Sequence, residues 1–170
     1  MYTPYEKRKR EIPFASAEYI SFASRNSFLG VPAVRLDDLG GGEVVIVGAP
    51  FDWGTTYRPG ARFGPQAIRM TDYLPHDGSR PSLALRTDGL QDLRVLDAGD
   101  VELPPGDIET TLGRLEAAIE KVARAGAIPV VLGGDHSIAY PDAQGVANEL
   151  GHGRVTMIHF DAHADTGDIE

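Results

Sequence analysis

The sequence predicts an α/β fold, a three-layer α/β/α sandwich with a parallel sheet, and two patterns support that prediction. Apolar runs of strand length recur along the chain, at residues 44–48, 94–98, 128–132 and 155–160. The runs are mostly continuous rather than alternating, which is typical of parallel strands that are buried on both faces. Helical patterns separate the runs, and strands that alternate with helices favour a parallel sheet covered on both sides.

The clearest helix is expected from about residue 107 to residue 125. Its apolar residues follow one another at steps of 4, 3, 4 and 3 and therefore share one face: Ile108, Leu112, Leu115, Ile119 and Val122. Asp107 suits the capping position at the start of this helix, and Gly126 suits the position after its end.

The segments between the other runs are shorter or less regular. One helix is expected to begin at Gly64-Pro65, because proline fits the first helical position, and another covers residues 138–150. The polar, proline-containing stretch 74–91 is expected to form a loop. We find no internal repeat and no linker to a second domain.

Composition limits the function classes. The 170 residues are 42% hydrophobic and 24% charged, as in soluble globular domains. No apolar run approaches the roughly 20 residues of a membrane span, and no apolar core follows the basic start, so a cytoplasmic protein is expected. The absence of cysteine excludes thiolate ligands and nucleophiles. A net charge of −9 argues against a nucleic-acid partner and suits a cationic substrate.

Two segments rich in polar side chains follow predicted strands. The third strand runs into Gly133-Gly134-Asp135-His136-Ser137, and the fourth runs into Asp161-Ala162-His163-Ala164-Asp165. Ligands of parallel α/β sheets bind beyond the carboxyl ends of the strands. Both segments are therefore expected at the functional site.

The spacing after the fourth strand predicts a metal site. His159, Asp161, His163 and Asp165 are two residues apart, so an extended backbone places them on one face. Carboxylates and imidazoles gathered this closely are costly without a partner, and a divalent cation removes that cost. The alternative without a metal is a turn in which the aspartates accept hydrogen bonds from backbone amides. This donor set favours Mn²⁺, with Zn²⁺ and Ni²⁺ as alternatives.

The glycine pair after the third strand allows a sharp turn that exposes His136 at the strand tip. A phosphate-binding loop is disfavoured, because no lysine follows the glycines. Alone, His136 could equally be a structural histidine. Beside Asp161, His163 and Asp165 it becomes a fourth candidate ligand, whereas His159 is better read as a partner of a ligand.

These motifs resemble a known family. GGDHS at 133–137 and HFDAHAD at 159–165 are similar to the paired metal motifs of the ureohydrolases, which include arginases and agmatinases. GAPFDWGTTYRPGARFGPQAIR at 48–69 and SFLGVPAV at 27–34 look like the agmatinase branch. The resemblance covers nearly the whole chain. It implies an arginase-like fold in which residues 1–170 form the amino-terminal part of one domain.

The resemblance also implies a chemistry. His136 and Asp165 would bind one Mn²⁺, His163 a second, and Asp161 would bridge the two; Ni²⁺ is the alternative metal. The reaction would be hydrolysis of a small cationic guanidino compound such as agmatine to urea and an amine. Other guanidino substrates (4-guanidinobutyrate, guanidine or a proclavaminate analogue) stay open, as does a non-catalytic metal-binding subunit.

The chain also departs from the family pattern. The family takes two further metal carboxylates from an Asp-x-Asp motif on a later strand, whereas this sequence stops at Glu170. We therefore expect a domain truncated after its fourth strand and little activity from these residues alone. The resemblance implies a homo-oligomer, a trimer or hexamer. Two rivals fit less well: a phosphoesterase would need basic phosphate clamps, and a metal-dependent deacetylase typically keeps one metal.

Overall fold

A parallel sheet forms the centre of the molecule. A computed structural model describes residues 27–71 and 81–165 of the chain. The sheet has the order β4–β1–β5, with β1 at Val44–Gly48, β4 at Val95–Asp100 and β5 at Ile128–Leu132. Both pairings with β1 are parallel. Three of the four predicted strands are therefore confirmed within two residues.

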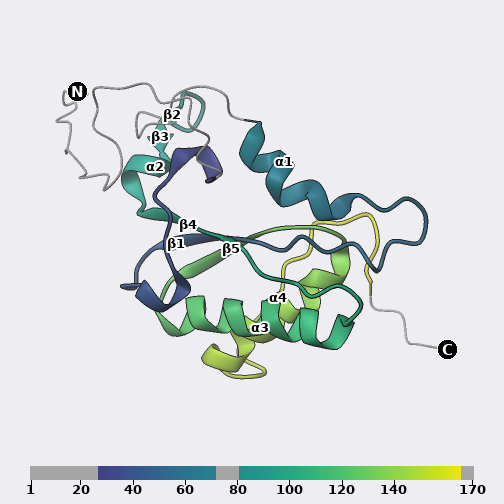
Figure 1. Cartoon of the computed structure of the whole chain (residues 1–170). Helices are drawn as coiled ribbons and strands as arrows, with labels where there is room; N and C mark the ends of the chain where they lie inside the picture. The colour runs from purple at the N-terminus through teal and green to yellow at the C-terminus, as the bar shows by residue number, and fades with distance from the viewer. Residues whose placement is uncertain (1–26, 72–80, 166–170) are drawn as a thin grey trace, which may run out of the picture.

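Helices lie on both faces of the sheet (Figure 1). Helix α3, at Ile108–Arg124, packs beside α4, at Ala139–Leu150, on one face, and α1, at Gly64–Met70, lies on the other. This arrangement confirms the predicted α/β/α sandwich. The predicted apolar face of α3 is confirmed from Leu115 to Val122, whose residues pack against β1, whereas Ile108 at the start of the helix is 50% exposed. The buried cluster contains Val45, Val47, Leu115, Ile119 and Val122. Asp107 caps α3, because its Oδ1 accepts from the Thr110 backbone N–H at 2.9 Å.

Short elements occupy the connections. Within residues 27–71 and 81–165, 3-10 turns lie at Phe28–Gly30, Leu36–Asp38, Ala61–Phe63 and His136–Ile138. The predicted loop over 74–91 falls partly outside the described residues. Its described part forms a two-residue antiparallel pair, β2 at Pro81–Ser82 with β3 at Thr87–Asp88, and α2 at Gly89–Asp92 follows. The turn between β2 and β3 carries Leu83 and Leu85, which are 90% and 76% exposed.

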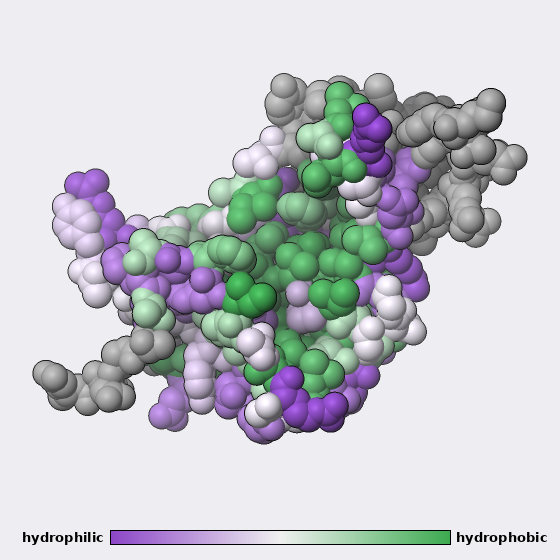
Figure 2. All heavy atoms as spheres, turned by 180° about the vertical axis from the view of Figure 1, so that it is seen from behind, coloured by the Kyte–Doolittle hydropathy of each residue, from purple (hydrophilic) through white to green (hydrophobic). Residues whose placement is uncertain are grey.

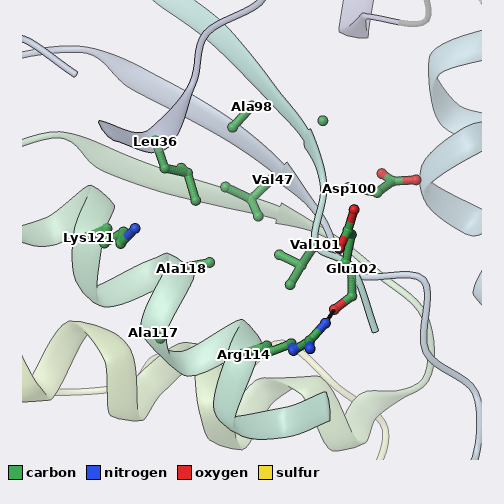
Figure 3. Close-up of a pocket in the computed structure, with 11 residues that line it drawn as sticks. Leu36, Val47, Ala98, Asp100, Val101, Glu102, Arg114, Ala117, Ala118 and Lys121 are labelled. Atoms are coloured by element: carbon green, nitrogen blue, oxygen red, sulfur yellow. Dashed lines mark hydrogen bonds between the residues drawn. The ribbon is translucent and has the colours of Figure 1, made fainter. Parts of the chain in front are cut away.

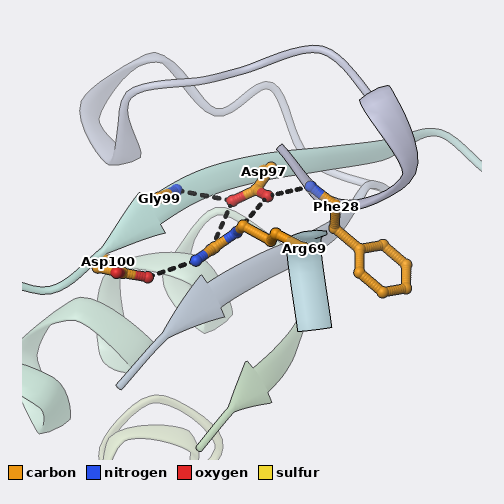
Figure 4. Close-up of polar contacts among 5 residues, drawn as sticks. All are labelled: Phe28, Arg69, Asp97, Gly99 and Asp100. Atoms are coloured by element: carbon orange, nitrogen blue, oxygen red, sulfur yellow. Dashed lines mark hydrogen bonds and ion pairs between the residues drawn. The ribbon is translucent and has the colours of Figure 1, made fainter. Parts of the chain in front are cut away.

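A buried ion pair joins α1 to the sheet (Figure 4). The Arg69 guanidinium donates from Nε and one terminal nitrogen to the two Asp97 oxygens, at 2.9 Å each, and also pairs with Asp100. Asp97 additionally accepts the backbone N–H groups of Phe28 and Gly99. The side chains of Arg69 and Asp97 are only 4% and 2% exposed. One carboxylate therefore fixes α1, β4 and the segment that precedes β1.

The fourth predicted strand, residues 155–160, is not a strand. Among the described residues, no backbone hydrogen bond joins this segment to a neighbour, and all six of its residues are exposed. An apolar run becomes a strand only where another strand pairs with its N–H and C=O groups. Residues 155–160 have the apolar composition of a strand, but no described strand pairs with them.

Apolar side chains are exposed both on β5 and in residues 155–160. Ile128 is 63% and Ile158 is 78% exposed, and Phe160 is 95% exposed. Figure 2, which views the molecule from behind, shows apolar side chains gathered across the middle of that face. No helix in the described part of the chain combines the length and apolar character that crossing a membrane requires.

Candidate metal centre

Sheet topology brings two loops together. The chain passes from β1 to β4 on one side of β1, and later adds β5 on the other side. Such a reversal opens a crevice at the carboxyl ends of the two diverging strands. The loops after β1 and β5 meet there: the Ala49 N–H donates to the Leu132 carbonyl at 2.8 Å, and the Asp135 N–H donates to the Phe51 carbonyl at 2.9 Å.

The turn after β5 presents His136. Gly134 has φ of +150°, and a Cβ at this position would lie 2.4 Å from the Phe51 carbonyl oxygen, so glycine is required. The Asp135 side chain then accepts from the Ser137 N–H at 2.9 Å. This bond caps the turn that leads into α4, and it leaves the His136 ring at the rim with its side chain 47% exposed.

The segment 159–165 lies against this turn. His136 Nε2 is 3.2 Å from Asp165 Oδ2, and the rings of His136 and His159 stack with centroids 4.9 Å apart and planes at 9°. His159 Nε2 is 3.4 Å from Asp161 Oδ2. Ligand atoms of His136, His159 and Asp161 all lie within 4.8 Å of one another. Two imidazoles and a carboxylate at this separation suit a divalent transition-metal ion.

The four predicted ligands converge unequally. His136 and Asp165 are in contact, but His163 Nδ1 is 3.9 Å from Asp161 Oδ1 and its side chain is 82% exposed. The extended backbone expected here bends at residues 161–163, and Asp165 has a positive φ of 51°. The bend turns His163 outward. His159, which shares the two-residue spacing, lies inside the cluster.

The charge of Asp161 is favoured by its surroundings. The backbone N–H of His163 donates to Asp161 Oδ1 at 2.9 Å and lowers the pKa of this carboxyl, and the nearby His159 and His136 rings lower it further. The group is therefore ionised at neutral pH, the form that binds a cation.

The loop after β1 is closed by its own ion pair. Asp52 accepts from the Gly60 N–H at 2.7 Å and from Arg62 Nε at 2.7 Å, and its side chain is fully buried. The Arg62 guanidinium, with the backbone N–H groups, lowers the pKa of Asp52 to about 2. Arg62 and Arg69 thus both form ion pairs with aspartates. The sequence reasoning missed Asp52, although an aspartate ahead of a glycine-rich loop is a recognised turn signal.

A hollow of about 360 Å³ lies away from these residues, beside the carboxyl end of β4 and α3 (Figure 3). Its charged rim is already paired: Lys121 binds Asp37 at 2.8 Å, and Arg114 donates to the Glu102 carbonyl at 3.0 Å. None of the candidate ligands lines it.

Known proteins resemble this chain in sequence and in fold. The mitochondrial guanidino acid hydrolase of Homo sapiens is 41% identical over 131 residues, which are 74% of this chain and 34% of that protein. The crystal structure of a hypothetical agmatinase from Burkholderia thailandensis matches 88% of this chain and 45% of its own, with 31% identity and a TM-score of 0.71. Formiminoglutamase from Trypanosoma cruzi, solved with Mn²⁺, matches 70% of this chain and 41% of its own, with 28% identity and a TM-score of 0.54.

The chain spans between a third and a half of the length of these relatives. These matches confirm the resemblance found in the motifs, and the solved structures confirm the arginase-like fold. Residues 42–170 match the Arginase family, and this range includes the sheet, α3, α4 and both segments of the candidate metal centre. The chain belongs to the arginase family.

Proposed function

We propose that the protein that carries this chain hydrolyses a guanidino compound to urea and an amine at a centre of two Mn²⁺ ions. The observation that supports this most directly is the approach of the 159–165 segment to the His136 turn, with His136 Nε2 3.2 Å from Asp165. Two segments 23 or more residues apart thereby gather imidazole and carboxylate groups at one rim.

We assign the ligands as the motifs suggest. His136 and Asp165 bind one ion, His163 binds the second, and Asp161 bridges both. The contact between His136 and Asp165 supports the first pair, whereas the assignment of His163 rests on the motif, since its side chain is 82% exposed. His159 serves as a partner that holds Asp161 through their 3.4 Å contact.

The substrate class follows from charge. A guanidinium group is cationic, and the net charge of −9 on this chain suits a cationic substrate. The guanidino carbon is a weak electrophile because its positive charge is spread over three nitrogens. Bound divalent metals would supply a water acidified toward neutral pH as the nucleophile.

We propose agmatine as the first substrate to test. Other guanidino compounds stay candidates, because the relatives are named for different ones. The human relative is named for guanidino acids, and the Burkholderia relative for agmatine. A urea-release assay over agmatine, 4-guanidinobutyrate, guanidine and a proclavaminate analogue, with Mn²⁺ or Ni²⁺ added, tests the proposal. It is run on these 170 residues and on any longer form that the gene encodes.

Three outcomes separate the alternatives. Urea release that requires metal supports the proposal, and we expect it to come chiefly from a longer form. Two ions bound without urea release from any compound would indicate a non-catalytic metal-binding subunit. Failure of every form to bind metal would overturn the proposed function.

A further inference from the structure

The Asp135 carboxylate joins the two loops that meet at the candidate metal centre. Its Oδ2 accepts the Gly54 N–H at 2.7 Å, and its Oδ1 accepts the Ser137 N–H at 2.9 Å. Gly54 and Asp135 are 81 residues apart in the chain. The Asp135 N–H also donates across the same gap, to the Phe51 carbonyl at 2.9 Å. One oxygen and the N–H of Asp135 thus connect the two loops, while the other oxygen caps the turn that carries His136.

The loops approach closely at two glycines of the segment that follows β1. A Cβ on Gly54 would lie 2.3 Å from Ser137 Oγ, and a Cβ on Gly64 would lie 2.2 Å from the Gly133 carbonyl oxygen. A methyl group on Gly64 would therefore push against backbone, whereas a methyl group on Gly54 would displace the Ser137 side chain and crowd the Asp135 carboxylate, whose oxygens would lie 3.1 and 3.2 Å from it. The turn that presents His136 therefore rests directly on the backbone of the loop after β1.

That loop has a shape of its own. Asp52 closes residues 52–62 into a ring by binding Gly60 and Arg62, as described above. We call residues 52–62 the Asp52 loop. Because the loop is closed independently of Asp135, the Gly54 N–H is a fixed point from which the Asp135 carboxylate can locate the His136 turn.

We propose that Asp135 is a positioning residue for the metal centre, and that it acts by locking His136 against the Asp52 loop. This inference rests on the proposed function, since the residue it positions is a proposed ligand. Asp135 is not itself offered as a ligand, because backbone N–H groups already occupy both of its oxygens. Asp135 caps the turn that carries His136, and the shape of this turn sets the direction of the His136 ring. Removal of such supporting bonds typically weakens metal binding about 10–100-fold.

The first test needs no metal. Amide hydrogen exchange and NMR of the His136 ring are measured on the whole chain and on Asp135→Ala, Asp135→Asn and Gly54→Ala. We expect faster exchange at Gly54 in Asp135→Ala, and averaged His136 ring signals. Asp135→Asn keeps one acceptor oxygen and should fall between Asp135→Ala and the parent. A Gly54 amide that exchanges in the parent protein as fast as in an unfolded chain would overturn the proposal.

The matched control is Asp107→Asn. Asp107 caps α3 through the Thr110 N–H at 2.9 Å, so it makes the same kind of bond as Asp135 but far from the candidate centre. This variant should leave Gly54 exchange and the His136 signals unchanged. If Asp107→Asn disturbed them as strongly as Asp135→Asn, the effect of Asp135 would be general loss of stability and not positioning.

The second test measures Co²⁺ binding by its visible absorption. We expect Asp135→Ala to bind about tenfold or more weakly than the parent, with an altered spectrum. Combining Asp135→Ala with Gly54→Ala should add little, because both changes open the same joint. Parent-like affinity and spectrum in Asp135→Ala would overturn the positioning role while leaving the proposed function intact. Absence of metal binding in every form of the unsubstituted protein, the longer form included, would overturn the proposed function, and this inference with it.

Discussion

The two sides of the sheet differ in how far their apolar residues are buried, although the sequence predicted buried strands on both. On the side of β1 and β4, which we call the covered side, Val45 and Val47 are at most 1% exposed beneath α3. On the side of β5 and residues 155–160, the open side, Ile158 is 78% exposed. Both sides carry apolar runs of strand length. An apolar run therefore indicates what a segment can bury, and its neighbours decide whether it does so.

The open side also carries every candidate metal ligand. The covered side is fixed by apolar packing and by the Arg69–Asp97 pair, whereas His136 and the 159–165 segment meet through polar contacts at the rim. Polar contacts at an exposed rim are individually weak. The proposed metal would add strong bonds to the open side, and the following predictions test the difference between the two sides.

The largest effect is expected at the buried ion pair of the covered side. Arg69→Met leaves Asp97 buried without its cation, which should lower the free energy of unfolding by about 3–5 kcal/mol. The control is Arg35→Met, because the Arg35–Asp38 pair is 82% and 67% exposed and should contribute at most about 1 kcal/mol. Chemical denaturation measures both. Equal losses in the two variants would contradict the special role of Arg69.

A pair of isoleucines compares the two sides directly. Ile119 is fully buried under the sheet, so Ile119→Ala should lower the free energy of unfolding by about 2–5 kcal/mol. Ile158→Ala removes the same atoms from a side chain that is 78% exposed and should change it by less than about 0.5 kcal/mol. A large loss at Ile158 in urea denaturation would show that the open side is covered in solution.

Sequence alone predicted most of the covered side. The 4-3-4-3 spacing in α3 and its Asp107 cap are local patterns, and the structure confirms both. Residues 155–160 have an equally apolar composition, but pairing depends on a second segment that local pattern does not identify. The fold class survived this error because three parallel strands and the helices on either side were correct.

The candidate site could be predicted only in part, because several of its contacts depend on how distant segments fold. The motifs single out His136 and Asp161 because their residue types and spacing are unusual in a core. Asp135 and Asp52 act through backbone N–H groups that the loop fold delivers, in one case from 81 residues away. No residue-type signal marks such a partner. The outward turn of His163 likewise arises from a bend that alternation does not foresee.

Metal should order the open side. Mn²⁺ at about 100 times its dissociation constant should raise the free energy of unfolding by about 2.7 kcal/mol and slow amide exchange over residues 159–165. Asp161→Ala should lose more metal than any other single ligand substitution, because it is proposed to bridge both ions. The control Asp38→Ala changes an exposed acid and should bind Mn²⁺ normally. Near-normal occupancy in Asp161→Ala, by elemental analysis, would remove it from the bridge.

The smallest effect is a pH dependence at the Asp52 loop. Arg62 lowers the pKa of Asp52 to about 2, from an ordinary value of about 3.9. The folded state thus holds this carboxyl ionised more strongly than the unfolded state does. The stability it contributes is fully present above about pH 4 and is lost as the pH falls from about 4 to about 2.

Asp52→Asn isolates this contribution, because an amide cannot titrate in that range. At neutral pH the variant should unfold at a lower temperature than the parent, and the gap should narrow steadily below about pH 4. Other carboxyls with lowered pKa values, such as Asp37 and Asp107, titrate in both proteins and cancel in the difference. A gap that stays constant from neutral pH to about pH 2 would mean that Asp52 is held by its backbone bonds without a benefit from its charge. In that event the Asp52 loop would owe its shape to hydrogen bonding alone.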